Sequence, residues 1–383
     1  MIRIGIIGIG NMGTSHLKNF EEGLIPGFIV TGVADLRESR RAFVQEEVRG
    51  DIVIFSEGTD LIKSGLCDAV LIATPHYQHP ELSMLAFANN LHVMCEKPAG
   101  VYTKQVEEMN EAAKKCDKVF AMMYNTRTVP VYIKVKSMME NGELGCMRRV
   151  NWITTDWYRT KSYYDSGSWR ATWEGEGGGV LLNQCPHTLD LIQWICGMPQ
   201  KVQAFCHEGK WHDIEVEDDV TAYLEFPGGA TGVFVTSTGD APGTNRIEIT
   251  GTLGKLVCED EKKLTFYKLD QNLQEHLDTC PEGFEKPGFT EIEIVVEGET
   301  DHHITVLKAF RDCIEKGTPL IAKGEEGING LELSNAMHLS SWLGQMVTLP
   351  IDADLFAAEL AKKRASSRVK KEVDVVMDTA GTY

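Results

Sequence analysis

The first 126 residues alternate short apolar runs with amphipathic stretches. Short apolar or β-branched runs are typical of buried strands, whereas apolar residues spaced by three and four are typical of helices. The pattern predicts strands at 3–9, 29–34, 52–55, 69–73, 91–95 and 119–123. It predicts helices between them, for example at 13–20, 80–89 and 103–116. Apolar strands that alternate with helices favour a doubly wound α/β domain, in which a parallel sheet is covered on both faces.

The texture changes after a predicted helix at 130–141. Strand-like runs separated by turn signals then follow in quick succession, at 201–206, 220–226, 231–236, 246–250, 255–258 and 291–296. Closely spaced strands of this kind favour a mostly antiparallel sheet, and helices are predicted at 187–196, 303–316 and 325–344. We therefore expect a first domain at 1–126, a second α+β domain at 127–349, and a partly helical C-terminal tail at 350–383.

Charge and composition exclude several classes of protein. The 383 residues carry a net charge of −18, which would repel nucleic acid and anionic lipid. Hydrophobic residues make up 43%, which excludes disorder, and no apolar run approaches the roughly 18 residues that span a bilayer. Ten cysteines without a C-x-x-C pair indicate reduced thiols and a cytoplasmic protein. Two histidine pairs, His207/His212 and His302/His303, lack partners at metal-ligand spacing, so we expect no metal site.

A glycine-rich turn follows the first predicted strand and opens a helix, and its cofactor-binding candidates are Gly8, Gly10, Asn11, Met12 and Gly13. The first glycine permits the tight turn, the second lets a pyrophosphate approach, and the third lets helix and strand pack closely. Asp35 follows the second strand at the distance expected for a ribose-binding acid. The motif predicts a Rossmann dinucleotide site that prefers NAD to NADP, although Arg37 and Arg40 weaken that preference. The alternative is a βα turn with incidental glycines.

Two further motifs lie at the carboxyl ends of predicted strands, where open α/β sheets bind ligands. Thr74 and Pro75 would form a loop wall against the cofactor, and His79 either contacts the cofactor or only caps the next helix. Glu96 and Lys97 follow the fifth strand. A lysine ammonium there can stabilise a developing alkoxide, whereas a lysine elsewhere would usually be a solvated surface residue.

Histidine chemistry is predicted after three consecutive glycines, Gly177–Gly179. If the helix is continuous, Asn183 and His187 share one face, whereas Pro186 can instead mark a later helix start. A histidine is suited to accept a hydroxyl proton near neutral pH. From this segment alone, a buried structural histidine is the more common alternative.

Aromatic residues crowd the segment 152–173, interleaved with charged residues such as Arg170. Flat rings stack on the apolar faces of pyranoses, so the segment suits a carbohydrate, although a packed aromatic core is equally compatible with it. The substrate-binding candidates are Arg127, Tyr158, Arg159, Trp173, Asn183 and His187.

Taken together, these motifs resemble the Gfo/Idh/MocA family of sugar and cyclitol dehydrogenases, from the first residue to about residue 349. The carriers are the glycine turn, Asp35, Ala73-Thr74-Pro75, Glu96-Lys97-Pro98, Gly177–Gly179 and His187-Thr188-Leu189-Asp190. The resemblance implies a Rossmann domain and a second domain with an open-faced sheet that mediates dimers or tetramers. It also implies catalytic roles for Lys97 and His187. The family often has an aspartate where this chain has Asn183, which leaves the proton relay open.

The expected reaction is hydride transfer between nicotinamide and a secondary hydroxyl of a sugar, glycoside or cyclitol, with ring C3 of a glucoside as one case. His187 would accept the proton, Lys97 would stabilise the alkoxide, and Asn183 would complete the catalytic set. One alternative retains NAD for sugar–sugar hydride exchange or redox-assisted glycoside cleavage. Another is a non-catalytic regulator that senses NAD.

Overall fold

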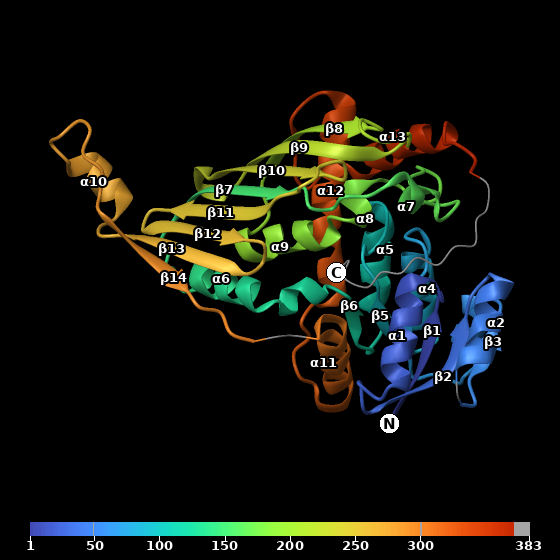
Figure 1. Cartoon of the computed structure of the whole chain (residues 1–383). Coiled ribbons are helices and arrows are strands. Elements are labelled where there is room, and N and C mark those ends of the chain that lie inside the picture. Colours follow the sequence, from blue (N-terminus) through green and yellow to red (C-terminus); the bar gives the residue numbers. More distant parts are fainter. Residues whose placement is uncertain (49, 299–300, 371–383) are drawn as a thin grey trace.

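The computed structural model describes residues 1–48, 50–298 and 301–370. The first domain holds a six-stranded, fully parallel sheet with the order β3-β2-β1-β4-β5-β6 (Figure 1). Its strands are β1 (Ile2–Ile7), β2 (Phe28–Ala34), β3 (Val53–Phe55), β4 (Ala69–Ile72), β5 (His92–Cys95) and β6 (Phe120–Met122). Its helices are α1 (Asn11–Glu21), α2 (Glu38–Glu47), α3 (Gly58–Lys63), α4 (Gln78–Ala88) and α5 (Thr103–Ala113). The predicted parallel α/β domain is confirmed.

The strand order reverses at β1, which pairs with β2 on one side and β4 on the other. The loops that leave the carboxyl ends of β1 and β4 therefore diverge to opposite faces of the sheet, which opens a place for a ligand between them. The glycine turn follows β1, the segment around Thr74 follows β4, and Lys97 follows β5. All three predicted motifs thus lie at the same edge of the sheet.

The second domain is built on a nine-stranded sheet with the order β14-β13-β12-β11-β7-β10-β9-β8-β15. The pair β7–β10 is parallel and the other pairs are antiparallel, so the sheet is mixed but mostly antiparallel, as expected. The strands are β7 (Met147–Thr154), β8 (Lys201–Glu208), β9 (Glu217–Glu225), β10 (Thr231–Ser237), β11 (Asn245–Gly251), β12 (Gly254–Glu259), β13 (Lys263–Leu269), β14 (Phe289–Ile294) and β15 (Val347–Thr348).

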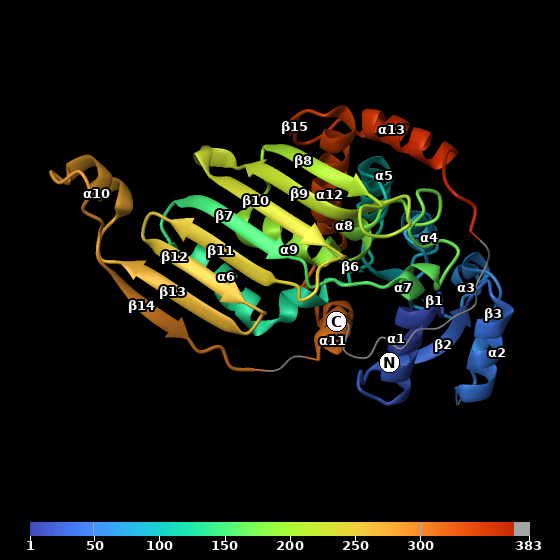
Figure 2. The same cartoon turned by 45° about the horizontal axis from the view of Figure 1, so that its top comes forward.

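Helices cover one face of this sheet, and Figure 2 shows the other face uncovered. The principal helices are α6 (Pro130–Glu140), α9 (Pro186–Cys196), α12 (Gly327–Leu343) and α13 (Ala353–Ala365). Short elements are α7 (Lys161–Asp165), α8 (Val180–Asn183), α10 (Leu273–Thr279), η1 (Asn125–Thr128), η2 (Pro227–Gly229) and η3 (Gly324–Glu326). The uncovered face exposes Ile153, Phe205, Tyr223 and Val233.

Three features differ from the predictions. The strands β7 and β13 were not predicted, and the end of β7, residues 152–154, falls in the aromatic segment that was assigned to ligand binding. The helix α11 (His302–Lys316), assigned to the second domain, packs Val306, Leu307 and Phe310 against the first sheet, so it belongs by packing to the first domain. The tail is helical only in α13, and residues 371–383 lie outside the described part. Within that part, no helix has the length and apolar character needed to cross a bilayer.

Candidate active site

The glycine turn after β1 has steric requirements at two positions. Gly8 has a φ of +92°, and a Cβ there would lie 2.6 Å from the carbonyl oxygen of Ala73. A Cβ on Gly13 would lie 1.8 Å from the carbonyl oxygen of Gly8. Both positions therefore require glycine for the close approach of β1, α1 and the loop after β4.

Gly10 differs, because a Cβ there would meet only Arg37 Nη2, at 3.8 Å. The first hydrogen bond of α1 runs from Thr14 N–H to the Gly10 carbonyl, so the amides of Asn11, Met12 and Gly13 precede the helix hydrogen bonds. Open space before these amides fits the diphosphate of a dinucleotide, which a helix N-terminus attracts.

Asp35 follows β2 and ties it to the glycine turn. Its Oδ2 accepts the Ile9 N–H at 2.7 Å, and its Oδ1 accepts the Arg37 N–H at 2.9 Å and Arg37 Nε at 3.3 Å. Arg40 is buried and donates to the Ile9 carbonyl at 2.7 Å and to Thr14 Oγ1 at 2.8 Å. The Arg40 guanidinium thus braces the glycine turn, whereas the sequence analysis expected it to weaken the preference for NAD. Arg37 remains partly exposed beside the acid.

His79 holds the two neighbouring loops together. Its Nδ1 lies 2.7 Å from the Pro98 carbonyl oxygen, and its Nε2 lies 2.7 Å from the Thr74 carbonyl oxygen. Both ring nitrogens thus face backbone, so we assign His79 a positioning role and no longer a cofactor contact. The Pro75 carbonyl closes a turn by accepting the Gln78 N–H at 3.0 Å. Thr74 Oγ1 is buried without a partner among the described residues, which leaves a hydroxyl available to a ligand.

Glu96 and Lys97 face different directions. Glu96 Oε1 lies 2.7 Å from His16 Nε2. Burial alone would raise the pKa of Glu96, but the hydrogen bond and charge of His16 lower it to about 2. Lys97 Nζ donates at 2.9 Å to the backbone carbonyl of Asn183 in the second domain. Burial lowers the pKa of Lys97, while the negative charge of Glu96 opposes that change.

The two domains meet at this lysine. Asn183 ends α8, and α9 begins with Pro186, so Asn183 and His187 do not share one continuous helix. His187 is buried at the start of α9, and its Nδ1 has no partner in the described part of the chain. Burial, followed by the positive charge of Lys97, holds the pKa of His187 well below 6.5. The imidazole is therefore neutral near pH 7 and able to accept a proton.

Glu176 is a carboxylate of the site that the sequence analysis missed. It is 2% exposed and accepts a hydrogen bond from Asn183 Nδ2. Its other oxygen accepts the Ala171 N–H, and burial raises its pKa. The signal in the sequence was an acid directly before the three glycines, where a solvated loop residue would have been the ordinary interpretation. Glu176 thus supplies a carboxylate next to the amide of Asn183.

The structure does not support two of the predicted substrate contacts. Arg127 is buried in ion pairs with Asp190 and Glu326. Trp173 is 2% exposed and packs edge-on against Trp342, at 5.6 Å between ring centroids, inside the second domain. Arg127 was misassigned because its acidic partners are distant in the chain, and Trp173 because the sequence does not show which rings of the aromatic segment turn inward.

The remaining candidates lie in the loop between β7 and α7. The ring of Tyr158 is half-exposed, and Arg159 donates to its backbone carbonyl at 2.9 Å. Arg159 Cζ also lies 5.0 Å from the ring centroid of Tyr163. Arg159 therefore remains in the candidate site.

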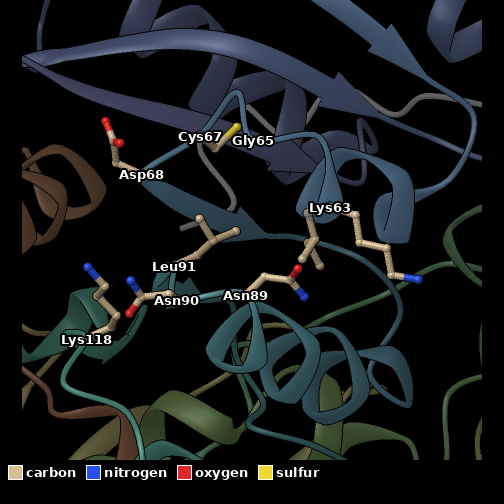
Figure 3. Close-up of a pocket in the computed structure, with 9 residues that line it drawn as sticks. Lys63, Gly65, Cys67, Asp68, Asn89, Asn90, Leu91 and Lys118 are labelled. Carbon is tan, nitrogen blue, oxygen red and sulfur yellow. The ribbon is translucent and has the colours of Figure 1, made fainter.

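Other features of the surface are separate from this site. One pocket is lined by residues that precede β4, β5 and β6, among them Cys67, Asp68, Leu91 and Lys118 (Figure 3). It lies at the amino ends of the parallel strands, opposite the edge that carries the motifs. The described residues contain no group of three or more His, Cys, Asp or Glu side chains able to hold a metal ion.

The family comparisons agree with this geometry. Residues 2–124 match the model described as "Oxidoreductase family, NAD-binding Rossmann fold", and residues 132–257 match the "GFO/IDH/MocA C-terminal domain". The fold and the site thus define an NAD-binding oxidoreductase, a dehydrogenase that acts on CH–OH groups. The chain belongs to the Gfo/Idh/MocA family.

Individual relatives extend this comparison over most of the chain. The chain is 26% identical to a myo-inositol 2-dehydrogenase of Thermotoga maritima, over 88% of this chain and 96% of the relative. It is 24% identical to a D-glucoside 3-dehydrogenase of Escherichia coli, over 91% and 97%. Among solved structures, the WlbA dehydrogenase of Chromobacterium violaceum in complex with NADH and UDP-GlcNAcA has a TM-score of 0.77 at 26% identity, covering 92% of this chain and 96% of that one.

Proposed function

We propose that this protein is an NAD-dependent dehydrogenase that oxidises a secondary hydroxyl of a sugar, glycoside or cyclitol. The observation that carries the proposal is a contact between Lys97 of the first domain and the segment of the second domain that leads to His187. Lys97 Nζ, from the first domain, lies 2.9 Å from the Asn183 carbonyl, only four residues before the neutral His187.

The residues support a simple division of labour. His187 accepts the proton of the substrate hydroxyl, because its neutral imidazole is the basic form at pH 7. The ammonium of Lys97 stabilises the alkoxide that this deprotonation produces. Asn183 and Glu176 hold the carbonyl that orients Lys97, through the hydrogen bond between their side chains. When bound, the nicotinamide supplies the hydride acceptor.

We propose NAD as the preferred cofactor. Asp35 follows β2, where an acid would contact the adenosine ribose, accept hydrogen bonds from its two hydroxyls and repel a 2′-phosphate. The adjacent Arg37 pairs with that carboxylate and so leaves less positive charge for a phosphate.

We also propose a substrate class, an assembly and a location. The relatives named for myo-inositol and for D-glucoside C3 favour a ring hydroxyl of a cyclitol or glucoside. The uncovered apolar face of the second sheet favours a homodimer or tetramer. All ten cysteines are free thiols, which suits the reducing cytoplasm.

A screen for NADH formation over neutral and acidic sugars, glycosides and inositols tests the proposal. Lys97→Met and His187→Asn should each lower kcat about 10²–10³-fold and leave the dissociation constant for NAD within a few-fold of the parent. Lys263→Met changes the exposed first residue of β13, and this control variant should match the parent. Near-parental kcat in both site variants would overturn the proposal.

Two other outcomes identify the alternatives. NAD that stays bound through purification, with sugar conversion but no net NADH, would indicate hydride exchange or redox-assisted glycoside cleavage. NAD affinity without turnover of any compound would indicate a regulator that senses the cofactor.

A further inference from the structure

The loop between β7 and the three glycines carries a rigid pair of guanidinium groups. Both guanidinium groups contact the ring of Tyr163, with Arg159 Cζ at 5.0 Å and Arg170 Cζ at 4.5 Å from its centroid. Arg170 Nη1 also donates to Tyr163 Oη at 2.8 Å, and its Nε donates to Ser166 Oγ at 3.1 Å. Cation–π stacking and hydrogen bonds therefore fix both groups in place before any ligand binds.

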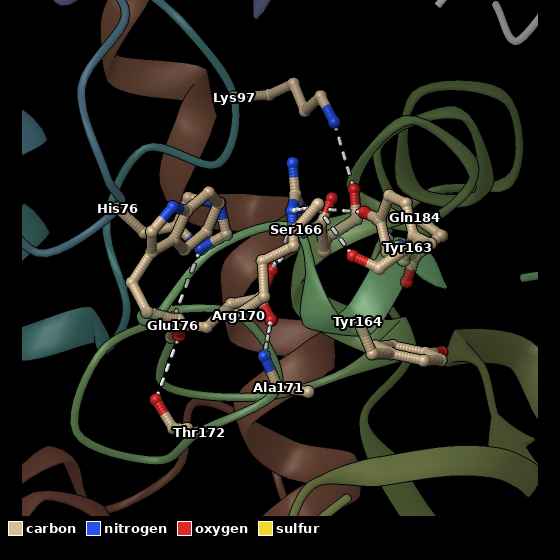
Figure 4. Close-up of polar contacts among 12 residues, drawn as sticks. His76, Lys97, Tyr163, Tyr164, Ser166, Arg170, Ala171, Thr172, Glu176 and Gln184 are labelled. Carbon is tan, nitrogen blue, oxygen red and sulfur yellow. Dashed lines mark hydrogen bonds and ion pairs between the residues drawn. The ribbon is translucent and has the colours of Figure 1, made fainter. Parts of the chain in front are cut away.

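Both arginines lie close enough to the proposed reaction centre for their charges to act on Lys97. Figure 4 shows the Lys97 ammonium and the Arg170 guanidinium pointing toward the same region, above the loop that carries Glu176. The positive charges of Arg159 and Arg170 both act on Lys97 and add to the effect of burial in lowering the pKa of its ammonium. Gln184, one residue after Asn183, donates to Tyr163 Oη at 3.1 Å and so ties the aromatic ring to the same site.

One of the two guanidinium groups has no acidic partner. Arg159 forms no ion pair within the described residues, and its one direct hydrogen bond from the guanidinium goes to the Tyr158 carbonyl. Arg170 pairs at 3.9 Å with Glu176, which also accepts hydrogen bonds from Asn183 and Ala171, so Glu176 offsets the charge of Arg170 and leaves that of Arg159. Such an excess of positive charge is notable in a chain with 56 acidic and 38 basic residues.

The C-terminal tail adds a further positive charge to this region. Lys370 Nζ donates to the backbone carbonyls of Tyr164 and Arg170, at 2.9 and 3.0 Å. The lysine is thus held against the same loop by backbone groups, and these contacts do not neutralise its charge.

Arg159 is not needed to hold its own loop. Its backbone N–H donates to the Thr238 carbonyl at 2.9 Å, and its backbone carbonyl lies 2.9 Å from His212 Nε2. The backbone of Arg159 therefore holds the loop, and the guanidinium keeps in-plane N–H donors for a ligand. A planar guanidinium with open donors is suited to bind an oxyanion through two parallel hydrogen bonds.

We propose that the substrate is a sugar derivative that carries an oxyanion, a carboxylate or a phosphate, which Arg159 and Arg170 bind beside Lys97. This inference rests on the proposed dehydrogenase function and specifies its substrate class. Two guanidinium groups next to Lys97 disfavour its protonated form by charge repulsion, although that form is the one that stabilises an alkoxide. A negative group on the substrate removes that conflict, because it neutralises the guanidinium charges while Lys97 performs its role.

Matched pairs of compounds test the proposal: methyl glucuronide against methyl glucoside for the carboxylate, and glucose 6-phosphate against glucose for the phosphate. Binding to the NADH-loaded protein is measured by calorimetry, and kcat/KM by NADH formation. We expect one anionic member to bind about 10- to 100-fold more tightly than its neutral partner, as for charge-assisted hydrogen bonds. The preference should fall as the salt concentration rises.

The variants Arg159→Gln and Arg170→Gln should each lower the anionic-to-neutral ratio of affinities by tenfold or more. Arg148→Gln removes an exposed guanidinium at the start of β7 and should leave that ratio unchanged. The proposal is overturned if no anionic member binds more tightly than its neutral partner, or if the Arg159 variant keeps the parental ratio. Preferential binding without any turnover would support the anion site and contradict the dehydrogenase function, so the two failures are distinguishable.

Discussion

Arg127 and Asp190 form a bidentate ion pair that is excluded from water. Arg127 Nε and Nη2 donate to the two oxygens of Asp190, each at 2.7 Å, and the two side chains are 2% and 0% exposed. Arg127 lies in η1, directly after the first domain, and Asp190 lies in α9, three residues after His187. The pair therefore fixes the helix that carries the proposed base relative to the nucleotide-binding domain.

Arg127→Met keeps the apolar stem but leaves a buried carboxylate without its partner. Breaking a buried pair on one side typically lowers the free energy of unfolding by about 3–5 kcal/mol. Arg3 provides a matched control, since it forms the same bidentate pair with Asp68 (2.7 and 3.1 Å) at side-chain exposures of 46% and 43%. For Arg3→Met the expected loss of unfolding free energy is much smaller, because water solvates the remaining acid.

Urea unfolding followed by tryptophan fluorescence and by circular dichroism measures both losses. Burial already raises the pKa of Asp190 while the hydrogen bonds from Arg127 lower it, so loss of Arg127 moves it higher. The cost of Arg127→Met should consequently shrink as the pH falls, because protonation discharges Asp190. The double variant Arg127→Met, Asp190→Leu should recover part of the stability. The reasoning is refuted if Arg127→Met costs no more than Arg3→Met, or if the double variant is less stable than the single one.

Three further predictions concern the cofactor site and pH. Gly13→Ala should weaken NAD binding at least tenfold, because its Cβ would meet the Gly8 carbonyl at 1.8 Å. Gly283→Ala is the control, because a Cβ there has no neighbour within 4 Å and should leave NAD affinity unchanged. A fluorescence titration with NAD measures both. Asp35→Ser should narrow the ratio of kcat/KM for NAD⁺ over NADP⁺, and an unchanged ratio would contradict the role of the acid. Burial lowers the pKa of His303 to about 4, so the unfolded chain takes up the proton first as the pH drops below 6.5. Urea midpoints should therefore fall from pH 6.5 toward pH 4, and less steeply for His303→Phe.

Local chemistry carried much of the prediction. The alternation of apolar strands and helices in residues 1–126 is a property of neighbouring residues, so it located all six strands of the first sheet. The glycine turn could also be predicted from the sequence. The positive φ at Gly8 and the close packing at Gly8 and Gly13 require glycine. The order of the motifs along the chain also predicted that the glycine turn, Thr74 and Lys97 would share one edge.

The roles of residues whose partners are distant in the chain could not be predicted in this way. Arg127 looked like a sugar-binding arginine until the fold brought Asp190 to it, 63 positions later. Trp173 was taken for a ligand contact because an amphipathic aromatic segment does not reveal which rings turn inward. Glu176 would ordinarily be interpreted as a solvated loop residue. In the structure, Asn183, at the break between α8 and α9, donates a hydrogen bond to it.

The sequence by itself determined the α/β first domain and the glycine turn, and it singled out the lysine and histidine that we propose carry out the chemistry. Hydrophobic periodicity and the steric requirement for glycine are set by a few neighbouring residues, so they can be recognised without the tertiary structure. Only the tertiary structure decided which cations are paired, which acid joins the site, and that α11 returns to the first domain. Those outcomes depend on burial and on charges that meet across the domain boundary, and no short stretch of chain specifies either.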